Sequence, residues 1–253
     1  MKLNKDKSIG EVVFIVEGEV GEQELIKKIF EKILDYNIYF YDKKNEEIIE
    51  LHSKNNKYSK VFIIPAEYSA ICKLDKSNDY FLGIFKKMSN LNLDVDNAAI
   101  YYLFDRDRKS NRPASIKKYI KKYHNSRDNE SEMNGLFLLS YPSIESFYLN
   151  NNNDKFEFEL GKEIKKYIEE NSILCNINED NLCAGCNNFF NILSKFNITN
   201  FDYNCLDNFA SINEKVFICE EKLFEKQKKY LTLSLLYVSL IDLGIIEIWL
   251  TLC

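Results

Sequence analysis

Short apolar runs separated by amphipathic segments fill the first 149 residues of this 253-residue chain, and this alternation restricts the fold more than any other feature. Four runs have the length and apolar character of buried strands: 11–16, 61–66, 98–104 and 136–139. Between them, residues 22–34 and 114–123 place apolar side chains on one helical face. Strands that alternate with helices form a parallel sheet covered on both faces, so the pattern predicts an α/β fold.

Two further stretches lie within this pattern. Residues 36–58 are polar and irregular, which favours a small hairpin insertion. A polar turn and then an amphipathic segment to about Met88 follow the run 61–66. A short helix through Leu149 is expected after Pro142.

The character of the chain changes after Leu149. The run 150–154 is polar and turn-prone, and it marks the predicted domain boundary. Beyond it the periodicity is helical over three segments: 159–170, 187–196 and, with breaks, 214–250. We therefore expect an α/β domain over residues 1–149 and a helical appendage over residues 150–253 that contacts a partner or a second copy.

Charge and cysteine content narrow the class of protein. With a net charge of −5, the chain does not coat nucleic acid non-specifically, so such binding requires a local basic patch. The seven cysteines follow a charged, polar start, which favours free thiols in a reducing cytoplasm. Residues 230–253 are long and apolar enough to suggest a membrane span, but Asp242 and Glu247 favour a buried helix or an oligomer contact.

Cys183 and Cys186 have the spacing of half a zinc site. The sequence contains no second C-x-x-C pair, so buried thiols are the prediction for these residues. A structural zinc site completed by Cys175, Cys205 or Cys219 is the alternative.

Acidic residues follow two of the predicted strands. Glu17 comes directly after the run 11–16, and Asp105 and Asp107 follow the run 98–104. Ligands of doubly wound sheets bind beyond the carboxyl ends of the strands, where these side chains are expected to meet. Carboxylate oxygens suit Mg²⁺ or Mn²⁺, and such ions activate water and stabilise the leaving oxygen of a phosphodiester.

These two strand ends resemble the TOPRIM domain of topoisomerases, bacterial primases, small ribonucleases and OLD-type nucleases. Residues 14–18 form an apolar strand that ends in Glu-Gly, and residues 102–107 form one that ends in Asp-x-Asp. The resemblance covers roughly residues 10–149. It implies a TOPRIM-like Rossmannoid sheet, in which Glu17 is a general acid/base or metal ligand and Asp105 and Asp107 are metal ligands.

Two further segments resemble a subset of this family. Residues 17–22 are similar to the E-G-x-x-[TS]-E start of RloB-like and OLD-like proteins, although Gly21 replaces the hydroxyl residue. Residues 141–149 are similar to the strand-Pro-x-x-Glu segment of the same proteins and of anti-phage effectors such as AriB of PARIS. The resemblance implies that Glu22 is a metal-site acid and Glu145 a catalytic acid. Ordinary acids in the first turn of a helix are the alternative for both.

The main basic cluster of the chain lies between these acids: Arg106, Arg108, Lys109, Arg112, Lys117, Lys118, Lys121, Lys122 and Arg127. A basic patch beside a cation site can bind a nucleic-acid backbone. Arg106, Arg108 and Lys109 are the predicted nucleic-acid contacts because they share a loop with Asp105 and Asp107. A solvated helix face is the interpretation for most of the other lysines.

The resemblance implies a Mg²⁺- or Mn²⁺-dependent nuclease that cleaves DNA or RNA, with transfer RNA among the targets, as an anti-phage defence effector. The chain contains no G-x-x-x-x-G-K-[ST] run, so the ATPase that accompanies OLD-like relatives would be a separate partner protein. A homo-oligomer is also expected, from the apolar C-terminal stretch.

Two other functions are compatible with the same residues. Residues 104–107 resemble the D-x-D nucleophile loop of phosphatases and phosphotransferases, an interpretation that leaves Glu17 unexplained. A TOPRIM-like module that binds a partner without catalysis is the third hypothesis.

Overall fold

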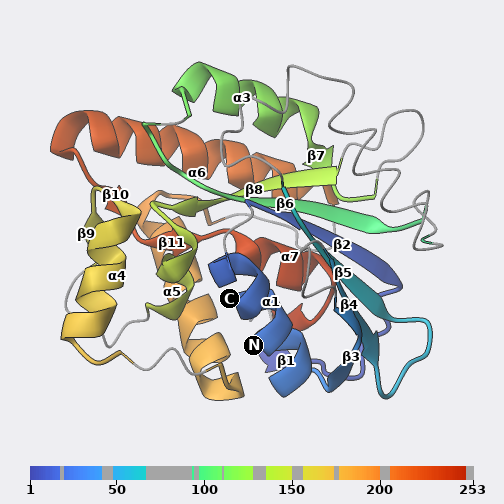
Figure 1. Ribbon diagram of the computed structural model, residues 1–253. Helices are drawn as coiled ribbons and strands as arrows, with labels where there is room; N and C mark the ends of the chain where they lie inside the picture. Colours follow the sequence, from blue (N-terminus) through green and yellow to red (C-terminus); the bar gives the residue numbers. More distant parts are fainter. Residues whose placement is uncertain are drawn as a thin grey trace.

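The computed structural model describes residues 1–17, 20–41, 48–66, 93, 97–109, 111–127, 135–149, 156–173, 177–199 and 206–248 (Figure 1). The predicted amphipathic segment that ends near Met88 lies outside these ranges, as do Cys175 and Cys205. Within the described residues, a central sheet lies between two layers of helices (Figure 1), which confirms the predicted α/β class.

The central sheet is mostly parallel. Among the described residues it has eight strands, seven of them in the order β11-β8-β6-β2-β5-β4-β3, while β7 (His124–Asn125) pairs with β8. Four strands run parallel at its centre: β2 (Glu11–Val16), β5 (Lys60–Pro65), β6 (Ala99–Asp105) and β8 (Gly135–Tyr141). They coincide with the four apolar runs of the sequence, because the side chains on both faces of each strand are buried.

The predicted hairpin within residues 36–58 is present, but it belongs to the main sheet. Its strands are β3 (Tyr36–Tyr41) and β4 (Ile49–Ser53), and β4 pairs antiparallel with β5. Ile49 and Leu51 are buried against the same core as β5. Residues 37–40 of the edge strand β3 are exposed, which explains why the segment reads as polar and irregular.

Helices cover the two faces of the sheet. The helix α1 (Val20–Lys32) lies on one face, and α3 (Pro113–Lys122) and α6 (Leu206–Gln227) lie on the other (Figure 1). Pro113 occupies the first turn of α3, as the sequence predicts. The short helix expected after Pro142 is the 3₁₀ helix η2 (Ile144–Tyr148).

The region after Leu149 is only partly helical. It contains α4 (Gly161–Glu170), α5 (Glu179–Lys195), α6 and α7 (Leu236–Asp242). The helical interpretation of residues 214–250 is wrong in its middle, which contains the two-residue strands β10 (Tyr230–Leu231) and β11 (Leu233–Ser234), and at its end, which contains β12 (Ile246–Glu247). A further two-residue strand, β9 (Glu157–Phe158), pairs with β10. These segments are strands because their backbone groups form hydrogen bonds with neighbouring strands. For example, β11 pairs with the backbone groups at the edge of β8.

The region after Leu149 also shares the core of the sheet. One hydrophobic cluster contains Leu139 of β8 together with Phe217 of α6 and Leu236 of α7. At the far end of the chain, β12 pairs with β1 (Lys2–Leu3). The domain boundary at Leu149 stays a prediction, and this packing indicates that the two regions depend on each other for stability.

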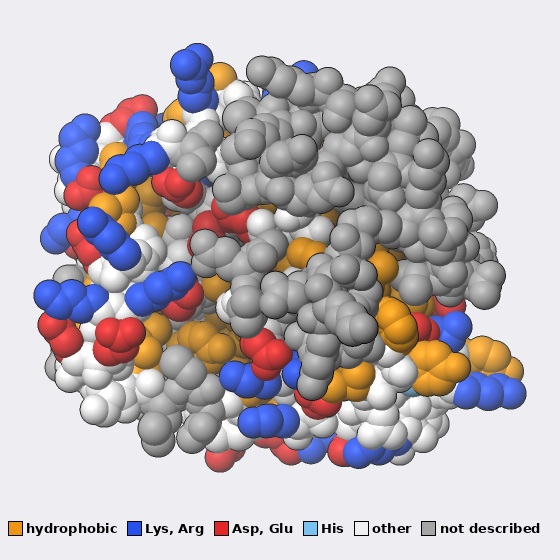
Figure 2. Space-filling model, in the orientation of Figure 1, with side chains coloured by type: hydrophobic (Ala, Val, Ile, Leu, Met, Phe, Trp, Pro, Cys, Tyr) orange, Lys and Arg blue, Asp and Glu red, His pale blue; other side chains and the backbone are white. Residues whose placement is uncertain are grey.

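The surface of α4 carries charges of both signs. Figure 2 shows Lys and Arg side chains among Asp and Glu side chains on the left side of the view, where Figure 1 places α4. Lys166 and Glu170, one turn apart on this helix, form an exposed ion pair at 3.4 Å. No helix within the described part of the chain combines the length and apolar character needed to cross a bilayer.

A polar network joins α7 to the sheet. Asp242 at the end of α7 accepts hydrogen bonds from the Tyr101 hydroxyl at 2.5 Å and the Ser126 hydroxyl at 2.6 Å. Its other oxygen accepts a hydrogen bond from Arg127 at 2.7 Å. Burial and the Asp242 charge raise the pKa of Tyr101, so the hydroxyl stays protonated as a donor.

We expect Asp242→Ala to lower the free energy of unfolding by about 3 kcal/mol, because it removes the carboxylate that accepts hydrogen bonds from the buried Tyr101 hydroxyl and from Arg127. Urea denaturation measures this change. The control is Glu169→Gln on the exposed face of α4, with an expected change within about 0.5 kcal/mol. Equal stability of the two variants would show that α7 does not depend on the network.

Candidate metal centre

The strand order places the candidate site at a change of direction in the sheet. From the central strand β2, the next parallel strand β5 lies on one side, and β6 and then β8 lie on the other. Such a switch point leaves a crevice beyond the carboxyl ends of the strands, where open α/β sheets bind ligands. Glu17 follows β2 and Asp105 ends β6, so both predicted acids flank this crevice.

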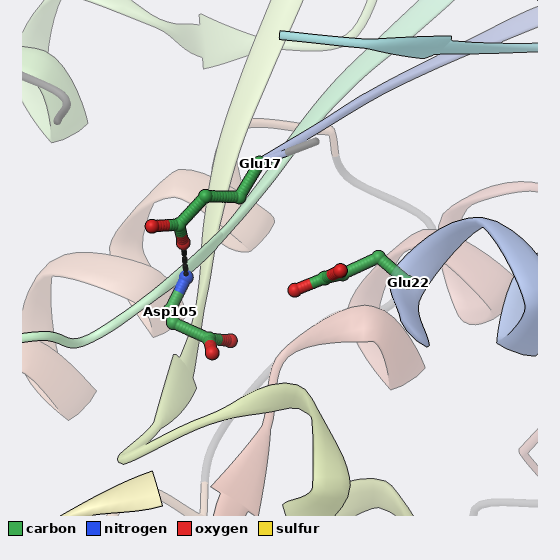
Figure 3. Close-up of side chains that lie close together, drawn as sticks. All are labelled: Glu17, Glu22 and Asp105. Atoms are coloured by element: carbon green, nitrogen blue, oxygen red, sulfur yellow. Dashed lines mark hydrogen bonds between the residues drawn. The ribbon is translucent and has the colours of Figure 1, made fainter. Parts of the chain in front are cut away.

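Three carboxylates converge there. Glu17, Glu22 and Asp105 each offer an oxygen, and these oxygens lie within 4.8 Å of one another (Figure 3). Glu22 comes from the first turn of α1, which begins just after β2 and therefore returns its side chain to the strand end. Glu22 is buried, with 2% of the residue exposed.

Backbone groups hold two of these carboxylates in place. The backbone N–H of Asp105 donates a hydrogen bond to Glu17 Oε2 at 2.8 Å (Figure 3). The backbone N–H of Ile144, at the start of η2, donates to Asp105 Oδ1 at 2.8 Å. The ends of β2 and β6 and the start of η2 are thus connected through the acids themselves, and the site is pre-organised.

The crowding of negative charge changes the acidity of Asp105. Its pKa is raised well above the ordinary value of 3.8, first because the carboxyl is buried and then because of the charges of Glu22, Glu17 and Glu145. The hydrogen bond from Ile144 acts in the opposite direction. A divalent cation would offset this repulsion, and a set of three carboxylates has the hard oxygen chemistry that Mg²⁺ and Mn²⁺ prefer.

Glu145 lies beside this cluster rather than within it. The Ser143 hydroxyl donates to Glu145 Oε2 at 2.7 Å, and Lys165 of α4 forms an ion pair with Glu145 Oε1 at 3.2 Å. A Cβ atom added to Gly21 would lie 4.0 Å from the same Oε1 atom, so α1 approaches Glu145 closely. The structure therefore brings Glu145 near the cluster as the sequence predicts, with its charge balanced by a lysine.

Asp107 occupies a different position. Its Oδ1 accepts a hydrogen bond from the backbone N–H of Lys109 at 2.9 Å and stabilises the turn after β6. It lines the same cavity as Glu17 and Asp105, although the close group of three carboxylates does not include it. Its assignment as a metal ligand stays a prediction.

The three predicted nucleic-acid contacts have different surroundings. Lys109 is exposed, and Arg108 is partly exposed, with its guanidinium 4.3 Å from the centre of the Phe224 ring. Arg106 points into the interior, where the residue is 1% exposed and its Nε donates to Glu221 of α6 at 2.7 Å. From this position the Arg106 side chain connects the loop to α6, although the residue also lines the cavity beside the carboxylates. Its assignment as a nucleic-acid contact stays a prediction.

Two residues near the site have no signal in the sequence pattern. Glu221 accepts from Arg106 and also lies 3.6 Å from Arg108, so one carboxylate of α6 holds two side chains of the loop between Asp105 and Lys109. Lys165 pairs with Glu145. Both lie beyond the predicted domain boundary, in amphipathic helices whose charged residues are ordinarily solvated, so only the three-dimensional structure identifies them.

The C-x-x-C pair lies on α5. Cys183 and Cys186 are free thiols, and burial raises the pKa of both, that of Cys186 more strongly. Two of the residues considered as further zinc ligands, Cys175 and Cys205, lie outside the described residues. Cys219 is described and is also a free thiol.

Fold and site together define an α/β protein with a cluster of three carboxylates at the switch point of its sheet. No family model, curated protein or solved structure matches the chain. The geometry of the site and the resemblance of its motifs therefore carry the functional argument.

We expect Asp105→Asn to stabilise the metal-free protein at neutral pH and to abolish Mn²⁺ binding. A carboxyl whose pKa is raised on folding stabilises the folded state when protonated, and this contribution is lost as the pH rises through the raised value. The amide removes the repulsion and retains an acceptor for Ile144. Thermal unfolding in EDTA and calorimetric titration with Mn²⁺ measure the two effects.

Asp107→Asn is the matched control for that experiment, because it removes a carboxylate from the same loop but outside the close group of three. Its thermal stability in EDTA is expected to stay near that of the wild type. A lower melting temperature for Asp105→Asn, or unchanged Mn²⁺ binding, would contradict the assignment of a cation site.

We expect Glu221→Ala to lower the free energy of unfolding by about 3–5 kcal/mol, because it leaves the buried Arg106 charge without its partner. Urea denaturation measures the change. Glu225→Ala, exposed on the same helix, is the control and should change stability by about 0.5 kcal/mol or less. If both variants have the wild-type stability, the ion pair does not hold the loop.

Proposed function

We propose that this chain is a TOPRIM-type nuclease that uses Mg²⁺ or Mn²⁺ to cleave phosphodiester bonds. The observation that supports the proposal most strongly is the convergence of Glu17, Glu22 and Asp105 within 4.8 Å at the ends of two parallel strands. Glu17 and Asp105 belong to the two motifs that resemble the TOPRIM domain, and Glu22 belongs to the segment 17–22 that resembles RloB-like and OLD-like proteins. Three converging carboxylates from separate elements are an expensive arrangement unless a cation balances them.

In this proposal the three carboxylates hold the cation, Asp107 acts from the wall of the adjoining cavity, and Glu145 acts from its position beside the three carboxylates. A cation bound there would lower the pKa of an attacking water and stabilise the leaving oxygen of the phosphodiester. The hydrogen bonds from Asp105 N–H and Ile144 N–H keep the ligand oxygens in place before the substrate arrives. Lys165 restrains Glu145, which is positioned to accept or return a proton.

The biological setting is proposed from the resemblance alone. The substrate would be DNA or RNA, with transfer RNA among the candidates, and the protein would act as an anti-phage effector in the cytoplasm. A separate ATPase would be its partner, and the region after Leu149 would contact that partner or a second copy.

The phosphotransferase alternative fits the site less well. Its nucleophile would be Asp105, but this carboxylate is crowded by Glu17 and Glu22, and its Oδ1 accepts a hydrogen bond from Ile144. Two adjacent carboxylates would repel the phosphate that the nucleophile must attack. The same two residues have a clear use in a cation site.

We expect Glu17→Gln and Asp105→Asn each to reduce Mg²⁺-dependent cleavage on the order of 100-fold, because each change removes an anionic ligand. The assay uses plasmid DNA and total RNA, with and without a candidate ATPase partner. Glu169→Gln, on the exposed face of α4, is the control and should cleave as the wild type does. Wild-type cleavage by both site variants would contradict the nuclease proposal.

A further inference from the structure

A cavity of about 240 Å³ opens beside the carboxylates, and charged residues of both signs line it. Glu17 and residues 105–108 line it from the strand ends. Glu159 and the α4 residues Lys162 and Lys165 line it from the region after Leu149. Residues separated by the predicted domain boundary thus form a single cavity.

The position of α4 against the site depends on close packing. A Cβ atom added to Gly161, the first residue of the helix, would lie 2.8 Å from Ser143 Cβ and 2.9 Å from Ser143 Oγ. The absence of a side chain therefore lets the helix start directly against the segment that precedes Glu145. Ile164 and Ile168 on the next turns pack with Leu149 and Phe158 in a separate small core that fixes the helix.

The two lysines of α4 that line the cavity have different surroundings. Lys165 forms the ion pair with Glu145, so its charge is used within the protein. Lys162 is exposed at the cavity, and among the described residues none forms an ion pair with it. Arg108 also lines the cavity, but it lies 3.6 Å from Glu221 and packs on Phe224. The charge of Lys162 is therefore available to an anion in the cavity.

We propose that Lys162 binds a backbone phosphate of the nucleic acid next to the bond that is cleaved, so that the C-terminal region supplies part of the substrate site. This inference rests on the proposed nuclease function. A phosphodiester that approaches the carboxylates meets more negative charge than one divalent cation balances, and a lysine that lines the same cavity compensates for it. Glu159 also lines the cavity, and its negative charge has the opposite effect on a bound anion.

The test is fluorescence anisotropy with a fluorescein-labelled single-stranded oligonucleotide, in DNA and RNA versions, with Ca²⁺ in place of Mg²⁺ to measure binding without turnover. Lys162→Gln is expected to weaken binding on the order of tenfold and to reduce the slope of log Kd against log salt by about 1. Glu159→Gln is expected to strengthen binding, because it removes a repelling charge. Lys166→Gln is the matched control, since this lysine is on the same helix but pairs with Glu170.

Each outcome decides the question. Weaker binding by Lys162→Gln, with Lys166→Gln near the wild type and unchanged thermal unfolding of both, supports the proposal. Equal affinities of the two lysine variants, with a wild type that binds the oligonucleotide, would overturn the role of Lys162 and leave the nuclease proposal intact. A wild type that binds neither oligonucleotide would overturn both proposals.

Discussion

Mutual repulsion among carboxylates is the constraint that the candidate site must satisfy. Glu17, Glu22 and Asp105 come from three elements, and each is directed by its element to the same point beyond the sheet. Backbone N–H groups counter part of the repulsion, through Asp105 to Glu17 and Ile144 to Asp105. The repulsion that these hydrogen bonds leave uncompensated is what a divalent cation would relieve in the proposed function.

The region after Leu149 completes this arrangement from two sides. Glu221 of α6 holds Arg106 and Arg108, the residues around Asp107, while Lys165 of α4 holds Glu145. A buried ion pair contributes little net stability compared with an apolar pair, but it fixes register and orientation when both partners are present. The loop after β6 is therefore positioned by a helix that begins about a hundred residues later in the chain.

The sheet and the acids could be predicted from the sequence for physical reasons that do not extend to the rest. Strands such as β2 and β6 are buried on both faces and stay apolar throughout, and adjacent carboxyl ends necessarily bring Glu17 and Asp105 together. Glu22 is predicted as a metal-site acid from the resemblance of residues 17–22 to RloB-like and OLD-like proteins. Strands β10 and β11 have two residues each, too few to show a period, and they depend on pairing with β9 and β8. Arg106 looked like a surface cation because its partner Glu221 lies 115 positions away.

The crowded carboxylates also have a consequence for the fraction of molecules that are folded. A ligand that binds only the folded state adds stability in proportion to the logarithm of its concentration relative to its dissociation constant. With repulsion built into the folded state and a cation to relieve it, the fraction of unfolded chains would vary with the supply of free divalent metal. Metal depletion would then act on the lifetime of the chain, through local opening and proteolysis, as well as on its chemistry.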